Sequence, residues 1–223
     1  MSAKEFIARR IALELKDGDV VNLGIGLPTL VANYLPKNVH LILQSENGFL
    51  GIGPVPEEVP PISAPRLVNA GGAPCGILPG GSTFDTSISF ALMRGGHLDA
   101  CVLGGLQVDE NADLANWMVP GKNVPGMGGA MDLAVGAKNV IVAMEHTNKG
   151  EQKILKKCNL PLTAKGRVST IVTELALFRF RDGKLVLEEH AAGVTVEEIR
   201  AGTEAAFIVS DKLKEMEISQ TGL

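Results

Sequence analysis

The tetrapeptide Ser45-Glu46-Asn47-Gly48 carries the side chain of this sequence best suited to covalent chemistry. The mostly apolar segment 41–44 predicts a buried strand, which places Glu46 at the end of that strand. Such a carboxylate departs from the usual pattern, in which glutamates face solvent. Asn-Gly is also a common turn pair, so an ordinary turn with an exposed acid is an equal interpretation of this tetrapeptide alone.

Two glycine-containing segments offer backbone N–H groups that suit an anionic oxygen. Gly24-Ile25-Gly26 follows an apolar strand predicted over 20–23, and Gly128-Gly129 belongs to a segment with four glycines, 121–132, that leads into an apolar helix. Turns of this kind can hold a phosphate or a carbonyl oxygen. A tight turn and a flexible connector are the simpler interpretations of the two segments.

Several common site motifs are missing from the sequence. Thr29 stands where the dinucleotide fingerprint has its third glycine, and no phosphate-binding GxxxxGK[ST] or hydrolase GxSxG motif occurs. The four histidines have no partner at metal-ligand spacing. We therefore expect no metal, no nicotinamide or flavin and no other permanently bound cofactor.

The composition limits which binding partners and which cellular compartment we expect for this protein. The formal charge of −4 provides no global positive field that would attract nucleic acid or an acidic membrane. The longest uncharged run, 67–84, holds five glycines and two prolines and is predicted to be loop and strand instead of a membrane span. Three widely separated cysteines and an N-terminus without an export signal favour a reducing compartment, so we expect a cytoplasmic protein.

The remaining pattern predicts one α/β domain over 1–223, with an open sheet covered by helices on both faces. Apolar periodicity predicts helices over 4–16 and 87–93. Pro28 suits the first turn of another helix. A short C-terminal helix is expected over 211–216. Thr195 and Glu198 have the spacing of a capping box. Five prolines make 54–65 an irregular excursion. Further strands are expected over 100–103, 140–144, 168–177 and 184–187.

Six ordered segments of the chain resemble the B subunit of 3-oxoacid coenzyme A transferases. They are NLGIGLPT (22–29), QSENG (44–48), RGGHLD (94–99), LANWMVPGK (114–122), GMGGAMD (126–132) and MEHTNKG (144–150). The resemblance runs from about residue 5 to about residue 180. It implies an open, mixed, largely parallel α/β sheet flanked by helices, related to the scaffold of sugar-phosphate isomerases.

The resemblance also implies a reaction and a partner. Glu46 becomes the nucleophile that carries coenzyme A as a thioester, while CoA moves from an acyl-CoA to a short-chain carboxylic acid such as acetoacetate or butyrate. A separate A subunit completes an A2B2 heterotetramer. On this basis we expect oxyanion or substrate contacts from Gly24, Gly26, Gly128, Gly129 and Asn47, and contacts with the CoA phosphates from Lys122 and Lys149.

Two other classes of function remain open from the sequence. One is a non-catalytic module that binds acyl-CoA or a sugar phosphate, because a fold does not decide between binding and catalysis. The other is an acyl-CoA hydrolase or isomerase in which Glu46 acts as a general base without a covalent adduct.

Overall fold

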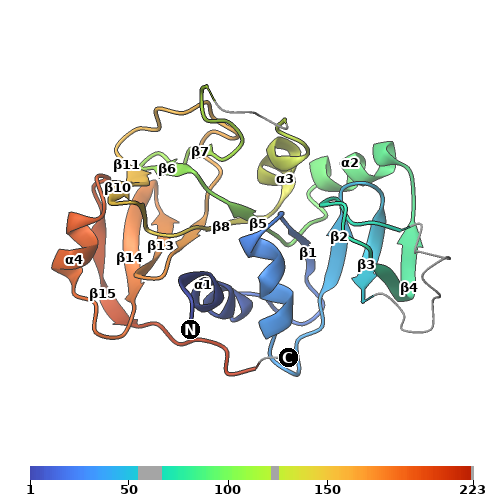
Figure 1. The fold of residues 1–223 in the computed structure, drawn as a ribbon, viewed down its shortest axis with the longest axis horizontal. Coiled ribbons are helices and arrows are strands. Elements are labelled where there is room, and N and C mark those ends of the chain that lie inside the picture. Colours follow the sequence, from blue (N-terminus) through green and yellow to red (C-terminus); the bar gives the residue numbers. More distant parts are fainter. Residues whose placement is uncertain (55–66, 122–125, 222–223) are drawn as a thin grey trace.

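A computed structural model describes residues 1–54, 67–121 and 126–221. Within these residues, a ten-stranded sheet runs through the molecule (Figure 1). Its strands are β1 (Val20–Leu23), β2 (Ile42–Ser45), β3 (Phe49–Gly53), β4 (Gly76–Thr83), β5 (Ala100–Gly104), β8 (Asn139–Ala143), β12 (Thr170–Val172), β13 (Ala176–Arg181), β14 (Lys184–His190) and β15 (Ile208–Glu215). Their spatial order is β15-β14-β13-β12-β8-β5-β1-β2-β3-β4.

The central strands from β12 to β2 are parallel to one another, and antiparallel pairings flank them on both sides. Strands β5 and β8 are almost continuously apolar, as expected of parallel strands that are covered on both faces. The predicted open, mixed, largely parallel α/β sheet is confirmed. Because the carboxyl ends of these strands meet at one edge, the turns after β1, β2, β5 and β8 lie along the same side of the molecule.

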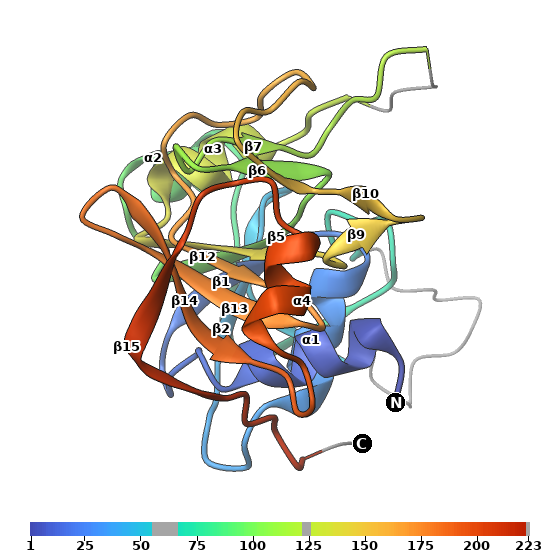
Figure 2. The same cartoon turned by 90° about the vertical axis from the view of Figure 1, so that its left-hand side faces the viewer.

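Two apolar cores lie on the two faces of the sheet. The helix α1 (Ala3–Ala12) and the 3-10 helix η1 (Leu27–Tyr34) bury Ile7, Ile11 and Val31 on one face. The opposite core gathers residues of α2 (Thr86–Arg94), α3 (Ala130–Gly136), α4 (Val196–Ala201) and a three-stranded sheet of β6 (Gln107–Asp109), β7 (Leu114–Ala115) and β11 (Ile154–Leu155). Figure 2 shows α1 and the β6–β7 region on opposite sides of the central strands.

Two predicted elements are wrong. The stretch 168–177 is not one strand but β12 and the start of β13, which pair antiparallel, because the Thr173 hydroxyl accepts the N–H groups of Leu175 and Ala176 and turns the chain. Residues 211–215 of the expected helical stub over 211–216 belong instead to β15, which pairs parallel with β14. A helix is a reasonable expectation for DKLKEM, but at a sheet edge its lysines reach solvent equally well.

Other expectations are confirmed or adjusted. The capping box at α4 is present, with Thr195 Oγ1 accepting from the Glu198 N–H at 3.2 Å and the Glu198 carboxylate accepting from the Thr195 N–H at 2.8 Å. The first helix ends at Ala12, earlier than predicted, and the segment that contains Pro28 is a 3-10 helix.

Of the proline-rich stretch 54–65, residues 55–65 lie outside the described residues. No helix in the described ranges combines the length and apolar character needed to cross a membrane.

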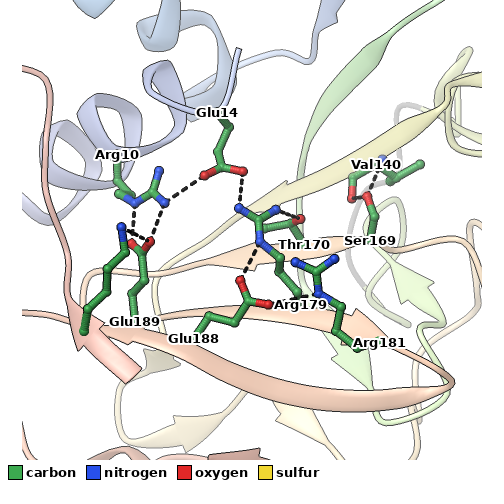
Figure 3. A network of polar contacts seen from close by, with 10 residues as sticks. Arg10, Glu14, Val140, Ser169, Thr170, Arg179, Arg181, Glu188 and Glu189 are labelled. Carbon is green, nitrogen blue, oxygen red and sulfur yellow. Dashed lines mark hydrogen bonds and ion pairs between the residues drawn. The ribbon is translucent and has the colours of Figure 1, made fainter. Parts of the chain in front are cut away.

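A network of buried and half-buried ion pairs fixes α1 against the last strands (Figure 3). The Arg10 guanidinium on α1 donates to both carboxylate oxygens of Glu189 on β14, at 2.6 and 2.9 Å, and also pairs with Glu14 at 2.7 Å. Arg179 on β13 bridges Glu14 and Glu188. Because Arg10 and Glu189 are both almost completely buried, removing either partner alone would leave a desolvated charge.

His146, just past the carboxyl end of β8, is a completely buried link to the α4 region. Its Nδ1 lies 2.9 Å from Thr173 Oγ1 and its Nε2 lies 3.0 Å from Thr203 Oγ1. Burial, with the nearby positive charge of Lys153, lowers the pKa of His146 from 6.5 to about 4. Between about pH 4 and pH 6.5 this ring is therefore neutral in the folded protein and protonated in the unfolded chain.

We expect stability to fall as the pH drops from 6.5 toward 4, since the unfolded state binds the extra proton in this window. The full effect is on the order of 3 kcal/mol. Urea unfolding between these pH values checks it. The His146→Gln variant should be less stable at pH 7 but should lose less stability on acidification, whereas His97→Gln, a change at an exposed histidine, should keep the wild-type slope. Equal slopes in all three proteins would contradict the assignment.

Candidate active site

Glu46 lies in the turn that joins β2 to β3. Ser45 pairs with Phe49 across this antiparallel hairpin, so Glu46, Asn47 and Gly48 form its loop. Gly48 has a φ of +124°, and a Cβ there would collide with the carbonyl oxygen of Phe84. Only glycine fits this position, and the resulting tight loop holds Glu46 at the carboxyl edge of the parallel strands.

The glycine segment before α3 meets Glu46 directly. The Gly129 N–H donates to Glu46 Oε1 at 3.2 Å, although the two residues are 83 positions apart in the sequence. A Cβ on Gly129 would lie 2.9 Å from the carboxyl carbon of Glu46, and one on Gly128 would lie 3.6 Å from Oε1. The structure therefore brings together three of the residues predicted for the site: Glu46, Gly128 and Gly129.

The segment 67–73 buttresses the other side of the Glu46 turn. The Asn47 side-chain amide donates to the carbonyl of Val68 at 2.7 Å, and Ser45 Oγ accepts the N–H of Ala70 at 2.9 Å. Ser45 Oγ also donates to Asn47 Oδ1 at 2.5 Å. The polar groups of Asn47 are thus bound to the turn and to segment 67–73, an arrangement that suits a role in orienting Glu46.

The Gly24–Gly26 turn lies beside the same segment. The Gly24 N–H donates to the carbonyl of Val102 at 2.8 Å and is therefore engaged within the sheet. Gly26 has a φ of +87°, and its carbonyl accepts from Thr29 at the start of η1. Ile25 between them is 73% exposed, and a Cβ added to Gly71 would lie 3.5 Å from Cγ1 of Ile25. An oxyanion contact from Gly24 or Gly26 stays a prediction, while their role in shaping the turn is visible.

The two predicted phosphate contacts stay untested by this geometry. Lys149 lies exposed at the tip of the hairpin of β9 (Thr147–Asn148) and β10 (Glu151–Gln152), with a φ of +51°. Lys122 lies outside the described residues.

A groove of about 630 Å³ opens at the same edge of the sheet. Leu27, Gly104 and Met144, which follow or end β1, β5 and β8, line it together with Lys153. Burial lowers the pKa of Lys153, while the carboxylates of Glu145 and Glu174 oppose that shift. From the sequence, Lys153 could contact a CoA phosphate, but a solvated lysine face is the favoured interpretation; its half-buried position depends on the packing of distant segments.

One feature missed from the sequence lies beneath the Glu46 turn. The polar side chains of Asn22, Gln44 and Ser89 are joined there by hydrogen bonds, and all three are buried. The available signal was the presence of Asn22 and Gln44 within otherwise apolar strands.

Comparisons with known proteins identify the family of the chain. The model of the family described as coenzyme A transferase matches residues 4–202. The beta subunit of the acetate CoA-transferase of Haemophilus influenzae is 67% identical over 224 residues, covering 100% of this chain and 99% of that protein. The B subunit of a probable succinyl-CoA:3-ketoacid coenzyme A transferase of Bacillus subtilis is 52% identical, covering 95% of this chain and 97% of that protein.

Among solved structures, the acyl-CoA transferase apoenzyme from Escherichia coli O157:H7 superposes with a TM-score of 0.78 at 22% identity. The match covers 97% of this chain and 43% of that one, which supports the shared fold. The family match and the relatives of similar length show that the chain belongs to the coenzyme A transferase family and is a CoA transferase chain of the beta, or B, type.

Proposed function

We propose that the chain transfers coenzyme A between an acyl-CoA and a short-chain carboxylic acid through a glutamyl-CoA thioester on Glu46. The observation that carries this proposal is the contact between the Gly129 N–H and Glu46 Oε1. It places a carboxylate against a backbone donor at the carboxyl edge of a parallel sheet, in a chain of this family.

The first half-reaction needs a nucleophile and produces two anionic intermediates. A Glu46 oxygen attacks the acyl-CoA carbonyl, and collapse of the tetrahedral intermediate expels the CoA thiolate and leaves a mixed anhydride. The thiolate then attacks the glutamyl carbonyl and releases the first acid as its carboxylate. The product is a thioester between Glu46 and CoA, so the free energy of the original thioester is retained.

The geometry suits the second of these attacks. When the thiolate adds to the glutamyl carbonyl, the oxygen already held by the Gly129 N–H becomes the anionic oxygen. A single donor in that position is worth roughly 3 to 4 kcal/mol in the transition state. Gly128, with a φ of +58°, lets the chain bend back so that the Gly129 N–H faces Glu46. The second acid reverses both steps and regenerates the free carboxylate.

The groove beside Leu27 is the proposed position of part of the CoA substrate. It opens at the same sheet edge as Glu46, and the half-buried ammonium of Lys153 gives it a positive group. The predicted contacts of Lys122 and Lys149 with the CoA phosphates remain part of this proposal. Neither the acid nor CoA requires a permanently bound cofactor or a metal for this chemistry.

A separate A subunit is proposed to cover the site and to form an A2B2 assembly in the cytoplasm. Apolar side chains are exposed on the segments that build the site: Ile25 is 73% exposed, Val68 41% and Met131 49%. Met131 lies two residues after Gly129. Exposed apolar groups gathered around a site are typical of a surface that another subunit covers. Both curated relatives are named as the beta or B subunit of their enzymes, which agrees with this.

The proposed acceptor is a short-chain acid, either acetate or a 3-oxo acid such as acetoacetate. One of the relatives is named for acetate and the other for a 3-ketoacid. A single methylene changes binding by only about 1 to 3 kcal/mol, so a panel of acids has to decide between them.

Mass spectrometry tests the proposal. The chain is mixed with its A subunit and each of acetyl-, butyryl-, acetoacetyl- and succinyl-CoA, and peptides that contain Glu46 are searched for covalently bound CoA. We expect a CoA adduct on Glu46 that disappears when the acceptor acid is added. Acyl-CoA hydrolysis without any adduct would favour a general-base function and contradict the proposal.

A further inference from the structure

A chain of buried polar side chains runs from β1 to the peptide group that precedes Glu46. Asn22 on β1 is 3% exposed, Gln44 on β2 is 2% exposed and Ser89 on α2 is completely buried. Asn22 and Gln44 lie opposite each other in the parallel pairing of β1 and β2. Uncharged polar groups in such positions cost free energy unless each is hydrogen-bonded, and these are.

The hydrogen bonds between these side chains all run in the same donor-to-acceptor direction, from Asn22 toward the Ser45 carbonyl. Asn22 Nδ2 donates to Gln44 Oε1 at 2.6 Å, and Gln44 Nε2 donates to Ser89 Oγ at 2.9 Å. The Ser89 hydroxyl then donates to the carbonyl oxygen of Ser45 at 3.4 Å. Hydrogen bonds arranged head to tail strengthen one another in a low-dielectric interior.

The last acceptor connects this chain to the active site. The Ser45 carbonyl belongs to the peptide bond between Ser45 and Glu46, and it also accepts the Gly48 N–H at 3.0 Å. Its two acceptor positions are thereby occupied from inside the loop and from the core. The orientation of this peptide plane sets where the Glu46 side chain leaves the backbone, and hence where its carboxylate meets Gly129.

We propose that Gln44 and Ser89 are positioning residues that hold the Ser45–Glu46 peptide so that the Glu46 carboxylate is aligned for attack. The inference rests on the proposed function of Glu46. Neither side chain touches the substrate in this role. Their loss therefore lowers kcat and slows formation of the glutamyl-CoA adduct, with little change in KM.

The Ser89→Ala variant removes the hydroxyl that donates to the Ser45 carbonyl, the last donor in this series of hydrogen bonds. We expect kcat and the rate of adduct formation to fall by roughly 10- to 100-fold, because small displacements of a reacting group cost this much. The unfolding temperature should also fall by several degrees, since Gln44 Nε2 loses its acceptor. All assays are made with the A subunit present and well below the unfolding temperature.

The matched control is Ser169→Ala. The Ser169 hydroxyl also donates to a strand carbonyl, that of Val140, at 2.8 Å, but at the opposite, amino end of β8. This variant should lose stability without losing kcat. A Ser89→Ala enzyme that loses stability and keeps the wild-type kcat would overturn the inference.

The Gln44→Glu variant tests the direction of the bonds. An ionised carboxylate has almost the same shape as the amide but only accepts, so the Ser89 hydroxyl turns toward it and leaves the Ser45 carbonyl. Burial raises the pKa of such a carboxyl, and its protonated form donates to Ser89 as the amide does. The kcat of this variant relative to wild type should therefore rise as the pH falls from about 8 to about 6, by up to about tenfold per pH unit.

The outcomes separate this inference from the proposed function. A Gln44→Glu defect of equal size at every pH would overturn the inference. If Glu46→Gln is inactive while Ser89→Ala and Gln44→Glu match wild type, the inference alone fails. If Glu46→Gln transfers CoA normally, the proposed function fails and takes this inference with it.

Discussion

The Glu46→Gln enzyme is expected to lose CoA transfer by roughly 10⁴-fold or more, because the amide oxygen cannot act as the nucleophile that carries the intermediate. The change preserves shape, and the Gly129 N–H can still donate to the amide oxygen as it does to Oε1. The fold and the unfolding temperature should therefore stay within about a degree or two of wild type. Steady-state exchange of CoA between acetate and acetoacetyl-CoA, with the A subunit present, measures the loss.

The Glu46→Asp enzyme is the informative companion to this variant. It keeps the carboxylate but withdraws it by one methylene from the Gly129 N–H, so its activity should lie between those of wild type and Glu46→Gln. An adduct should still form, more slowly. Retention of wild-type exchange by Glu46→Gln would remove Glu46 as the nucleophile.

The second large effect is expected from Gly129→Ala. The added Cβ would lie 2.9 Å from Cδ and 3.0 Å from Oε2 of Glu46. The flexible end of the glutamate can move away, so the cost falls on the position of the carboxylate and not on the fold. Because the Gly129 φ is −80°, alanine also fits the backbone there. We expect kcat/KM to fall by roughly 10²- to 10³-fold with the unfolding temperature nearly unchanged.

The Gly128→Ala variant tests whether direct crowding of Glu46 is the cause of this loss. A Cβ there would be 3.6 Å from Oε1, an ordinary contact, but the φ of +58° is unfavourable for alanine. This variant should lose on the order of 1 kcal/mol of stability and much less activity than Gly129→Ala. The reverse pattern, in which Gly128→Ala is the less active of the two, would show that direct crowding of Glu46 is not the cause.

Much of the fold could be predicted because local patterns and global packing agree. The apolar run of β1 and the capping box of α4 are each contained within a few residues, and both are found where the sequence predicts them. The errors arise where tertiary pairing decides. Nothing in the run from 168 to 177 marks the reversal at Thr173, and the edge position of β15 follows only from its pairing with β14.

In the site, too, residue types could be predicted from local sequence, whereas contacts between distant segments could not. Glu46 could be singled out from its tetrapeptide, and the glycines at 128 and 129 from their clustering, because chemistry of this kind needs particular residue types. The contact between Glu46 and Gly129 closes a loop of 83 residues, and no local rule predicts it. The chain from Asn22 to Ser89 joins two strands and a helix, so it becomes visible only after the sheet order is known.

The pairing of Arg10 with Glu189 has a consequence for the order of events during synthesis. The guanidinium leaves the ribosome 179 residues before its main carboxylate partner does. At elongation rates of roughly 5 to 20 residues per second this interval is roughly 10 to 40 seconds. In that time only Glu14, one helical turn away, is available to neutralise Arg10. The ion pair that fixes the first helix against β14 can therefore form only after β14 has emerged, which makes this contact a late step in folding.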